Sequence, residues 1–146
     1  MILPIDTDGC VLPVSDTLKQ ILNDLATELI QQPDTLLDHS GITFNFRDPD
    51  YSPERGGYHP VEIRLGRHSD VFRFEYFTDF AWVGQGWDTE LAKELDFDLT
   101  QGCFQLQSFQ PVTIAESVDI FESFQRNLIA YYEMDVFNVS VKVDEA

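Results

Sequence analysis

The chain has 146 residues and a formal net charge of −17, because 26 acidic side chains face only 9 basic ones. Hydrophobic residues make up 43% and aromatic residues 13% of the chain, a composition that excludes a disordered acidic polypeptide. The length predicts a single folded domain over residues 1–146. The charge argues against direct nucleic-acid binding and favours basic partners.

Residues 1–14 are interpreted as an N-terminal extension. They lack the basic start and the continuous apolar stretch of a secretory signal. No window approaches the roughly 18 consecutive apolar residues of a membrane-spanning helix. Cys10 and Cys103 lie far apart and form no metal or redox pattern, so we expect two idle thiols. Together these features predict a cytoplasmic protein that does not enter a membrane.

The first regular element is predicted as a helix over residues 15–32. Ser15 is suited to cap its start, and apolar residues then recur at three- and four-residue steps. These apolar positions are Leu18, Ile21, Leu22, Leu25 and Leu29. Pro33 ends the helix, because proline disfavours the helical conformation in the residue before it.

Residues 42–107 change to a period of two, which is typical of antiparallel strands with one buried face. Turn-rich segments separate predicted strands at residues 42–47, 61–65, 71–83, 94–99 and 104–106. In the long strand, Phe72, Phe74 and Tyr76 share one face. Further along it the aromatic residues break the alternation, which indicates a bulge or bend near Phe77 to Asp79.

A second amphipathic helix is predicted over residues 113–134, and a final strand over residues 136–143. Strands joined by short turns favour an antiparallel sheet, and two helices can cover one of its faces. The sequence therefore predicts an α+β fold. Its core is a twisted antiparallel sheet of about five to seven strands, flanked by an N-terminal and a C-terminal helix.

The candidate acidic binding face consists of Glu94, Asp96 and Asp98. At two-residue steps these carboxylates should project from one strand face about 7 Å apart. Such a row could bind a basic surface, hold Ca²⁺ or perform acid/base chemistry. The simpler interpretation is a solvated strand face that discourages edge-to-edge aggregation.

No catalytic or metal-binding pattern stands out in the sequence. His59 and Glu62 should point to opposite faces of a strand, and no second histidine has metal-ligand spacing. His59 is therefore interpreted as structural, and we expect no cofactor, no metal and no enzymatic activity. An enzyme of unfamiliar type would need His59, Glu62 and Asp79 to converge in a cleft, whereas we expect no pocket that gathers titratable groups.

Four segments resemble an uncharacterised bacterial family, domain of unknown function 2787, whose members occur in marine gammaproteobacteria and on genomic islands. They are residues 46–52 (FRDPDYS), 56–65 (GGYHPVEIRL), 78–84 (TDFAWVG) and 94–98 (ELDFD). The family is similar in fold to the acidic mitochondrial matrix glycoprotein that binds the globular heads of a complement component. That resemblance implies an acidic, oligomerising, ligand-binding scaffold without an active site. It assigns no role to His59, Glu62 or Asp79, which lie in these segments.

Three hypotheses for function follow. The first is a non-enzymatic acidic protein that engages a basic protein surface, for example that of a host protein. The second is a DNA-mimic decoy of a mobile element against a host defence protein, which the neutral, arginine-containing middle of the chain disfavours. The third is the enzyme of unfamiliar type. We also expect a homo-oligomer, a dimer or trimer, because Phe77 and Val83 would need cover on a sheet face that the helices leave open.

Overall fold

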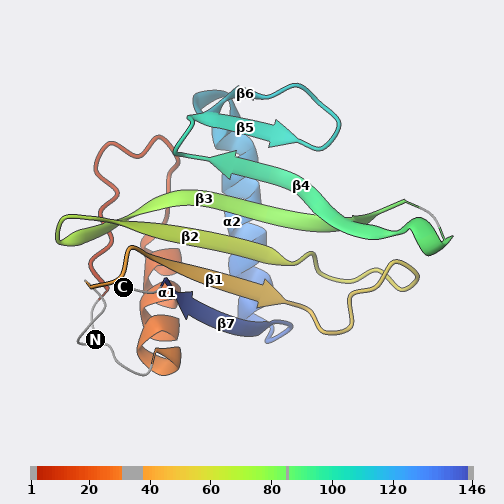
Figure 1. Ribbon diagram of the computed structural model, residues 1–146, viewed down its shortest axis with the longest axis horizontal. Coiled ribbons are helices and arrows are strands. Elements are labelled where there is room, and N and C mark those ends of the chain that lie inside the picture. The colour runs from red at the N-terminus through yellow and green to blue at the C-terminus, as the bar shows by residue number, and fades with distance from the viewer. Residues whose placement is uncertain (1–2, 31–37, 85, 145–146) are drawn as a thin grey trace.

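The computed structural model describes residues 3–30, 38–84 and 86–144, and its centre is one antiparallel sheet of seven strands (Figure 1). The strands are β1 (Gly41–Arg47), β2 (Val61–His68), β3 (Val71–Val83), β4 (Glu90–Asp98), β5 (Cys103–Leu106), β6 (Val112–Thr113) and β7 (Asn138–Val143). Their order across the sheet is β6-β5-β4-β3-β2-β1-β7. The chain therefore runs as a meander from β1 to β6 and returns to place β7 beside β1.

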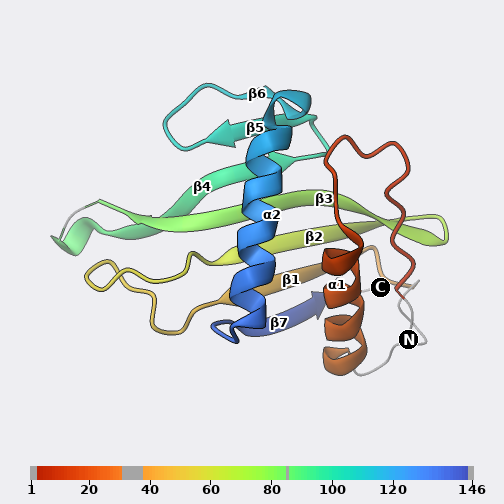
Figure 2. The same ribbon diagram turned by 180° about the vertical axis from the view of Figure 1, so that it is seen from behind.

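Two helices, α1 (Asp16–Leu29) and α2 (Val118–Glu133), cover the same face of this sheet (Figure 2). The predicted α+β class with helices on one face is confirmed. The predicted strands and final strand are also confirmed, whereas the two-residue β6 was not expected.

The start of α1 follows from its capping residue. The Ser15 hydroxyl accepts a hydrogen bond from the Leu18 amide at 3.1 Å, which satisfies one of the free amides of the first turn. Leu18, Leu22 and Leu25 are buried along one side of the helix, as the sequence spacing predicted. The helix ends earlier than predicted, because Ile30 already has an extended backbone and its amide donates to the Ala26 carbonyl oxygen. Residues 31–33, where the end was predicted, lie outside the described residues.

The second helix starts with a tighter turn than predicted. Residues Ile114–Ser117 form the 3₁₀ turn η3, in which the Ser117 hydroxyl donates to the Ile114 carbonyl oxygen at 2.7 Å. From Val118 the chain continues as α2, which crosses one face of the sheet from the β6 edge to the β7 edge (Figure 2). Phe121, Phe124 and Leu128 are buried beneath it.

Phenylalanine rings join α2 to the sheet. The ring of Phe77 on β3 lies 4.9 Å from that of Phe121, and the ring of Phe97 on β4 lies 5.4 Å from that of Phe124. Phe77 and Phe97 have no exposed surface. The expectation that Phe77 needs cover from another subunit is therefore wrong, because α2 covers it.

Two bulges interrupt the sheet. On the β3–β4 pair, Asp79 opposes Leu95 and Phe80 opposes Lys93, so Glu94 is an extra residue on β4. The sequence predicted an irregularity near Phe77 to Asp79, and one lies there, but its extra residue is on β4 rather than on the long strand β3. On the β2–β3 pair the register shifts between Arg64 and Leu65.

The second shift corrects one feature of the predicted long strand. Leu65 opposes Phe74 and Arg64 opposes Tyr76, so Glu75 is the extra residue on β3. Tyr76 therefore leaves the face that Phe74 shares with the core, and its hydroxyl donates a hydrogen bond to Glu62. The predicted common face for Phe72, Phe74 and Tyr76 is wrong at Tyr76.

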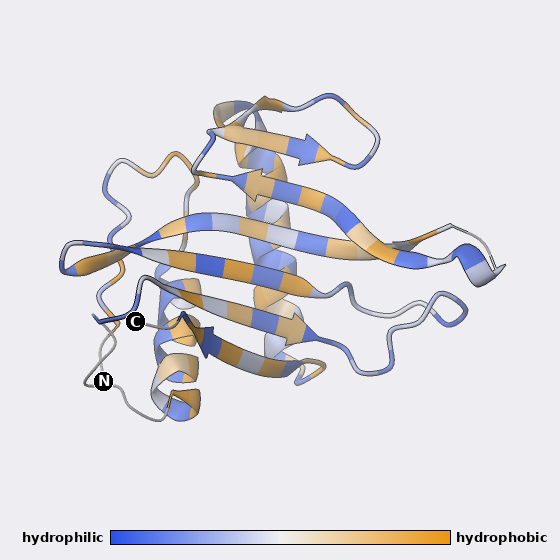
Figure 3. Ribbon diagram, viewed as in Figure 1, coloured by the Kyte–Doolittle hydropathy of each residue, from blue (hydrophilic) through white to orange (hydrophobic). Residues whose placement is uncertain are grey.

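Hydrophilic and hydrophobic residues alternate along the strands (Figure 3), and polar side chains on the face away from the helices pair with one another. Arg64 donates to Glu75 at 2.8 Å and to Asp144 at 2.6 Å, which links β2 to β3 and to the residue that follows β7. The hydrogen bonds from Arg64 lower the pKa of Asp144 to about 2. This face therefore needs no apolar cover of the kind that the sequence suggested.

The N-terminal extension is part of the core. Leu3 and Leu12 are buried, and the Phe72 amide donates to the Pro4 carbonyl oxygen at 2.8 Å. Both cysteines, Cys10 and Cys103, are free thiols, as expected. Among the described residues, neither helix has the length and apolar character that crossing a bilayer requires.

The phenylalanine contacts predict a large stability effect. Phe77→Ala should lower the free energy of unfolding by about 3–5 kcal/mol, because it removes a fully buried ring and leaves a cavity beneath α2. Denaturant titration followed by circular dichroism measures this change. Trp87→Ala is the control, since Trp87 is 97% exposed and its loss should change stability by less than about 0.5 kcal/mol. A Phe77→Ala effect as small as that of the control would contradict this account of the core.

Candidate functional site

The loop between β1 and β2 is organised around Asp48. One carboxylate oxygen of Asp48 accepts from the Tyr58 amide at 3.0 Å, and the other accepts from the Asp50 amide at 2.9 Å. Gly57 packs against the same carboxylate with φ of +136°, and a Cβ there would lie 2.7 Å from Asp48 Oδ2. The loop therefore requires glycine at this position.

The same loop is attached to β3. The Tyr51 hydroxyl accepts a hydrogen bond from the Trp82 amide at 3.1 Å, and its ring centroid lies 5.5 Å from that of His59. Pro60 favours an extended backbone for His59 and accepts from the Phe80 amide at 2.9 Å. These contacts place the His59 imidazole beside β3 at the start of β2.

The β4 bulge brings a second strand to this position. Because Glu94 and Leu95 both lie opposite Asp79, Glu94 leaves the alternation of its strand. The Leu95 amide donates to Asp79 Oδ1 at 2.8 Å, which fixes the Asp79 carboxylate. The other oxygen of Asp79 is then directed toward His59.

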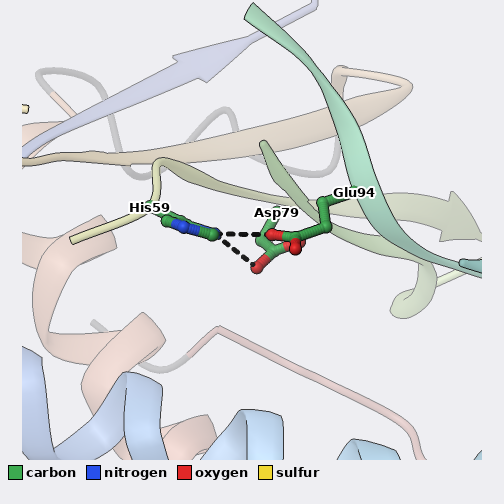
Figure 4. A group of neighbouring side chains, drawn as sticks. All are labelled: His59, Asp79 and Glu94. Carbon is green, nitrogen blue, oxygen red and sulfur yellow. Dashed lines mark hydrogen bonds and ion pairs between the residues drawn. The ribbon is translucent and has the colours of Figure 1, made fainter. Parts of the chain in front are cut away.

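These elements assemble a cluster of His59, Asp79 and Glu94 (Figure 4). His59 Nδ1 lies 2.7 Å from Glu94 Oε2 and 3.4 Å from Asp79 Oδ2. The imidazole edge points at both carboxylates, which come from two neighbouring strands. Such an arrangement can bind a cation or exchange a proton.

The two carboxylates stabilise the charged imidazole. They raise the pKa of His59 above its usual range, with the hydrogen bond from Asp79 as the largest cause, while partial burial opposes the shift. The negative charges of Glu94 and Asp79 and a hydrogen bond with Glu94 raise this pKa further. Among the described residues, no Lys or Arg forms an ion pair with either carboxylate.

A pocket of about 270 Å³ opens beside the cluster, between α2 and the sheet. Its polar side contains His59 and Asp79, and Tyr58 and Tyr131 stand on its wall with ring centroids 4.6 Å apart. The remaining lining is largely apolar: Val61, Leu95, Phe124, Leu128 and Phe137, together with Gly57 and Asn127. The expectation that no pocket gathers titratable groups is therefore wrong.

The candidate residues from the sequence divide between the two faces of the sheet. His59 and Asp79 meet at the pocket, whereas Glu62 lies on the opposite face with Tyr76. His59 and Glu62 thus point apart, as their spacing predicted. Convergence of all three residues is excluded.

The predicted common face of Glu94, Asp96 and Asp98 is wrong at Glu94, whereas Asp96 and Asp98 keep the regular alternation opposite Thr78 and Tyr76. Glu94 reaches His59, whereas Asp96 accepts from the Thr78 hydroxyl at 2.8 Å. Asp98 accepts hydrogen bonds in the turn that follows its strand. The bulge is the physical reason, because an extra residue reverses the side-chain alternation within the strand.

Neutralising Asp79 tests the electrostatics of the cluster. In metal-free protein, Asp79→Asn should lower the pKa of His59, since the variant loses the charge but keeps an oxygen that can accept from Leu95. The raised pKa means that the His59 contribution to stability is present below about 6.5 and is lost as the pH rises through the folded-state pKa. The stability difference between wild type and Asp79→Asn should therefore shrink with rising pH.

NMR titration of the His59 ring signals measures the pKa, and denaturant titration across the same pH range measures the stability difference. Asp96→Asn is the matched control, because it removes the same charge from the opposite sheet face. Equal shifts in the two variants would contradict a specific effect of Asp79.

Comparison with known proteins places this fold and its motifs in a family. A family model described as a protein of unknown function (DUF2787) matches residues 15–142. No curated protein matches the chain.

Two solved structures from Vibrio cholerae are similar over nearly the whole chain. The hypothetical protein VC0508 from the VSP-II pathogenicity island has 30% identity and a TM-score of 0.84, covering 92% of this chain and 95% of its own. The conserved hypothetical protein VC1805 from pathogenicity island VPI-2 has 32% identity and a TM-score of 0.76, covering 90% and 95%. VC1805 is described as sharing structural homology with the human P32 protein. With a family match that spans most of its length, the chain belongs to the DUF2787 family.

Proposed function

We propose that this protein is a non-enzymatic acidic binding protein that engages a basic surface of another protein. The observation that carries the proposal is the concentration of exposed carboxylates on the two helices. Eight exposed acidic residues lie on or beside them: Asp16, Asp24, Glu28, Glu116, Asp119, Glu122, Glu133 and Asp135. Only Lys19 and Arg126 offset this charge along the same elements. We call this surface the acidic helical layer.

The sheet carries its cations differently. Arg64 pairs with Glu75 and Asp144, and Lys93 approaches Asp96. Because these carboxylates are already paired with cations, the polar sheet face offers a partner less unpaired negative charge than the acidic helical layer does. Complementarity to a basic partner is therefore strongest where the helices lie.

A groove between α1 and the end of α2 gives this layer an apolar element. It has a volume of about 500 Å³, and its acidic residues are Glu28, Glu133 and Asp135. The apolar and aromatic lining is Leu25, Leu29, Tyr132, Phe137 and Val139. Burial, followed by the charges of Glu28 and other nearby carboxylates, raises the pKa of Tyr132. A basic segment with apolar side chains would match both the lining and the charge of this groove.

The similarity of VC1805 to P32 supports a binding role at the level of fold alone. The DNA-mimic alternative has less support, because a decoy needs a continuous row of carboxylates. Glu94, which would begin such a row on β4, instead contacts His59.

The test compares partner capture by two variants with equal charge. The first, Glu28→Gln/Glu133→Gln/Asp135→Asn, neutralises the acidic side of the groove. Exposed charge pairs contribute roughly 0.2–1 kcal/mol each, so affinity for a partner captured from lysate should fall roughly 3-fold to more than 100-fold. Binding should also weaken between about 0.1 M and 1 M salt, as the Debye length falls from roughly 10 Å to 3 Å.

The matched control is Asp50→Asn/Glu54→Gln/Asp88→Asn, which removes three exposed charges from loops outside the helices. Partner affinities measured by biolayer interferometry should be near wild type for this variant. Equal losses of affinity in both variants would mean that only the net charge matters and not the position of the carboxylates. Unchanged binding at high salt would contradict an electrostatic contribution.

Self-association stays a prediction of its own. We expect a dimer or trimer that tightens as salt is raised, because the net charge of −17 opposes contact between copies. Analytical ultracentrifugation at tens of micromolar and two ionic strengths measures the assembly state. A single species of monomer mass at both ionic strengths would contradict the prediction.

A further inference from the structure

We propose that His59, Asp79 and Glu94 form a binding site for a divalent transition-metal ion, with Zn²⁺ as the best match. The site goes beyond the proposed engagement of basic proteins, which uses the acidic helical layer. It rests on three observations: the convergence of the ligand atoms, the supports that hold them and the pocket beside them.

The three side chains offer one nitrogen and two oxygen ligands within 4.8 Å of one another. Two ligand atoms that each lie about 2.1 Å from a tetrahedral metal ion are about 3.4 Å apart. His59 Nδ1 and Asp79 Oδ2 already have this separation, at 3.4 Å. Glu94 Oε2, at 2.7 Å from the imidazole, is about 0.7 Å closer to it than this separation, and its side chain is partly exposed and long enough to adjust.

The residues around the cluster hold the ligands in place. The Leu95 amide fixes one oxygen of Asp79 and leaves the other directed toward His59, as an outer-shell hydrogen bond does in metal sites. The ring of Tyr51 packs against His59, and Pro60 restricts the His59 backbone. The site thus belongs to a supported arrangement rather than to a chance encounter of surface carboxylates (Figure 4).

The ligand set selects the class of metal. Mg²⁺ and Ca²⁺ prefer sites made of oxygen ligands, whereas an imidazole with carboxylates suits Zn²⁺ and its neighbours in the first transition row. Two carboxylates also supply the charge that a divalent ion requires, and no described Lys or Arg forms an ion pair with them. Three protein ligands leave a fourth position, which can be filled by water or by a ligand from the adjoining pocket.

Isothermal titration calorimetry with ZnCl₂ on chelator-treated, dialysed full-length protein tests the proposal. We expect one saturable equivalent of Zn²⁺, together with a shift of the His59 ring signals in NMR spectra. His59→Ala and Glu94→Gln should each weaken this binding at least about tenfold, since even outer-shell changes weaken metal sites by roughly 10- to 100-fold. His68→Ala is the control, because His68 is exposed at the end of β2, outside the cluster. The Zn²⁺ affinity of this variant should equal that of wild type.

Thermal unfolding separates ligand loss from misfolding. Zn²⁺ should raise the Tm of wild type and of His68→Ala, because an ion that binds the folded state stabilises it, and should raise it less in the two cluster variants. Glu94 is partly exposed, so Glu94→Gln keeps its fold and decides the matter if His59→Ala unfolds. Absence of a saturable site in wild type, or equal Zn²⁺ affinity in wild type and Glu94→Gln, would overturn the proposal.

Discussion

The packing of α2 on the phenylalanines of β3 and β4 is the contact on which the rest of the structure depends. Phe77 and Phe97 present flat rings to Phe121 and Phe124, and this contact holds the helix across the strands. Because the inner side of α2 is occupied by these rings, its acidic residues face outward. The pocket lies between α2 and the sheet, at the point where the helix passes His59 and Asp79. Core packing, surface charge and candidate site therefore share one physical origin.

The carboxylates of this protein serve two different purposes. Some form hydrogen bonds within the fold: Asp48 accepts from the backbone of its loop, and Asp144 accepts from Arg64. Others lie on the helices, where far fewer Lys and Arg side chains are present. These carboxylates give the acidic helical layer its charge. A net charge of −17 describes neither group by itself. Only the partners of each carboxylate separate the structural residues from those available to another molecule.

The site depends on an irregularity in the sheet. In a regular strand Glu94 would share a face with Asp96, and the cluster around His59 would have one carboxylate fewer. The extra residue in β4 turns Glu94 toward His59, while Asp79 accepts from the amide of the next residue, Leu95. Bulges are frequent near functional positions, where the local bend of the strand redirects a side chain.

The sequence by itself determined the fold class and the order of the main helices and strands, although several of their ends lie a few residues from those predicted. Hydrophobic residues that recur every two residues indicate strands, and those that recur every three to four residues indicate helices. A capping residue such as Ser15 marks the start of a helix. These signals depend on neighbours in the chain, so strands such as Val71–Val83 were located correctly. The motif residues His59 and Asp79 were also singled out, although their meeting in a pocket was not expected.

Only the tertiary structure decided which face Glu94 occupies, which rings cover Phe77 and where the exposed charge lies. Each of these depends on register between strands or on the path of α2. A one-residue shift in pairing reverses the face of a side chain without changing the sequence pattern. The cluster of His59, Asp79 and Glu94 joins residues from a loop and two strands, so no local spacing could reveal it. Long-range pairing is fixed by packing over the whole sheet, and that is information the linear pattern does not contain.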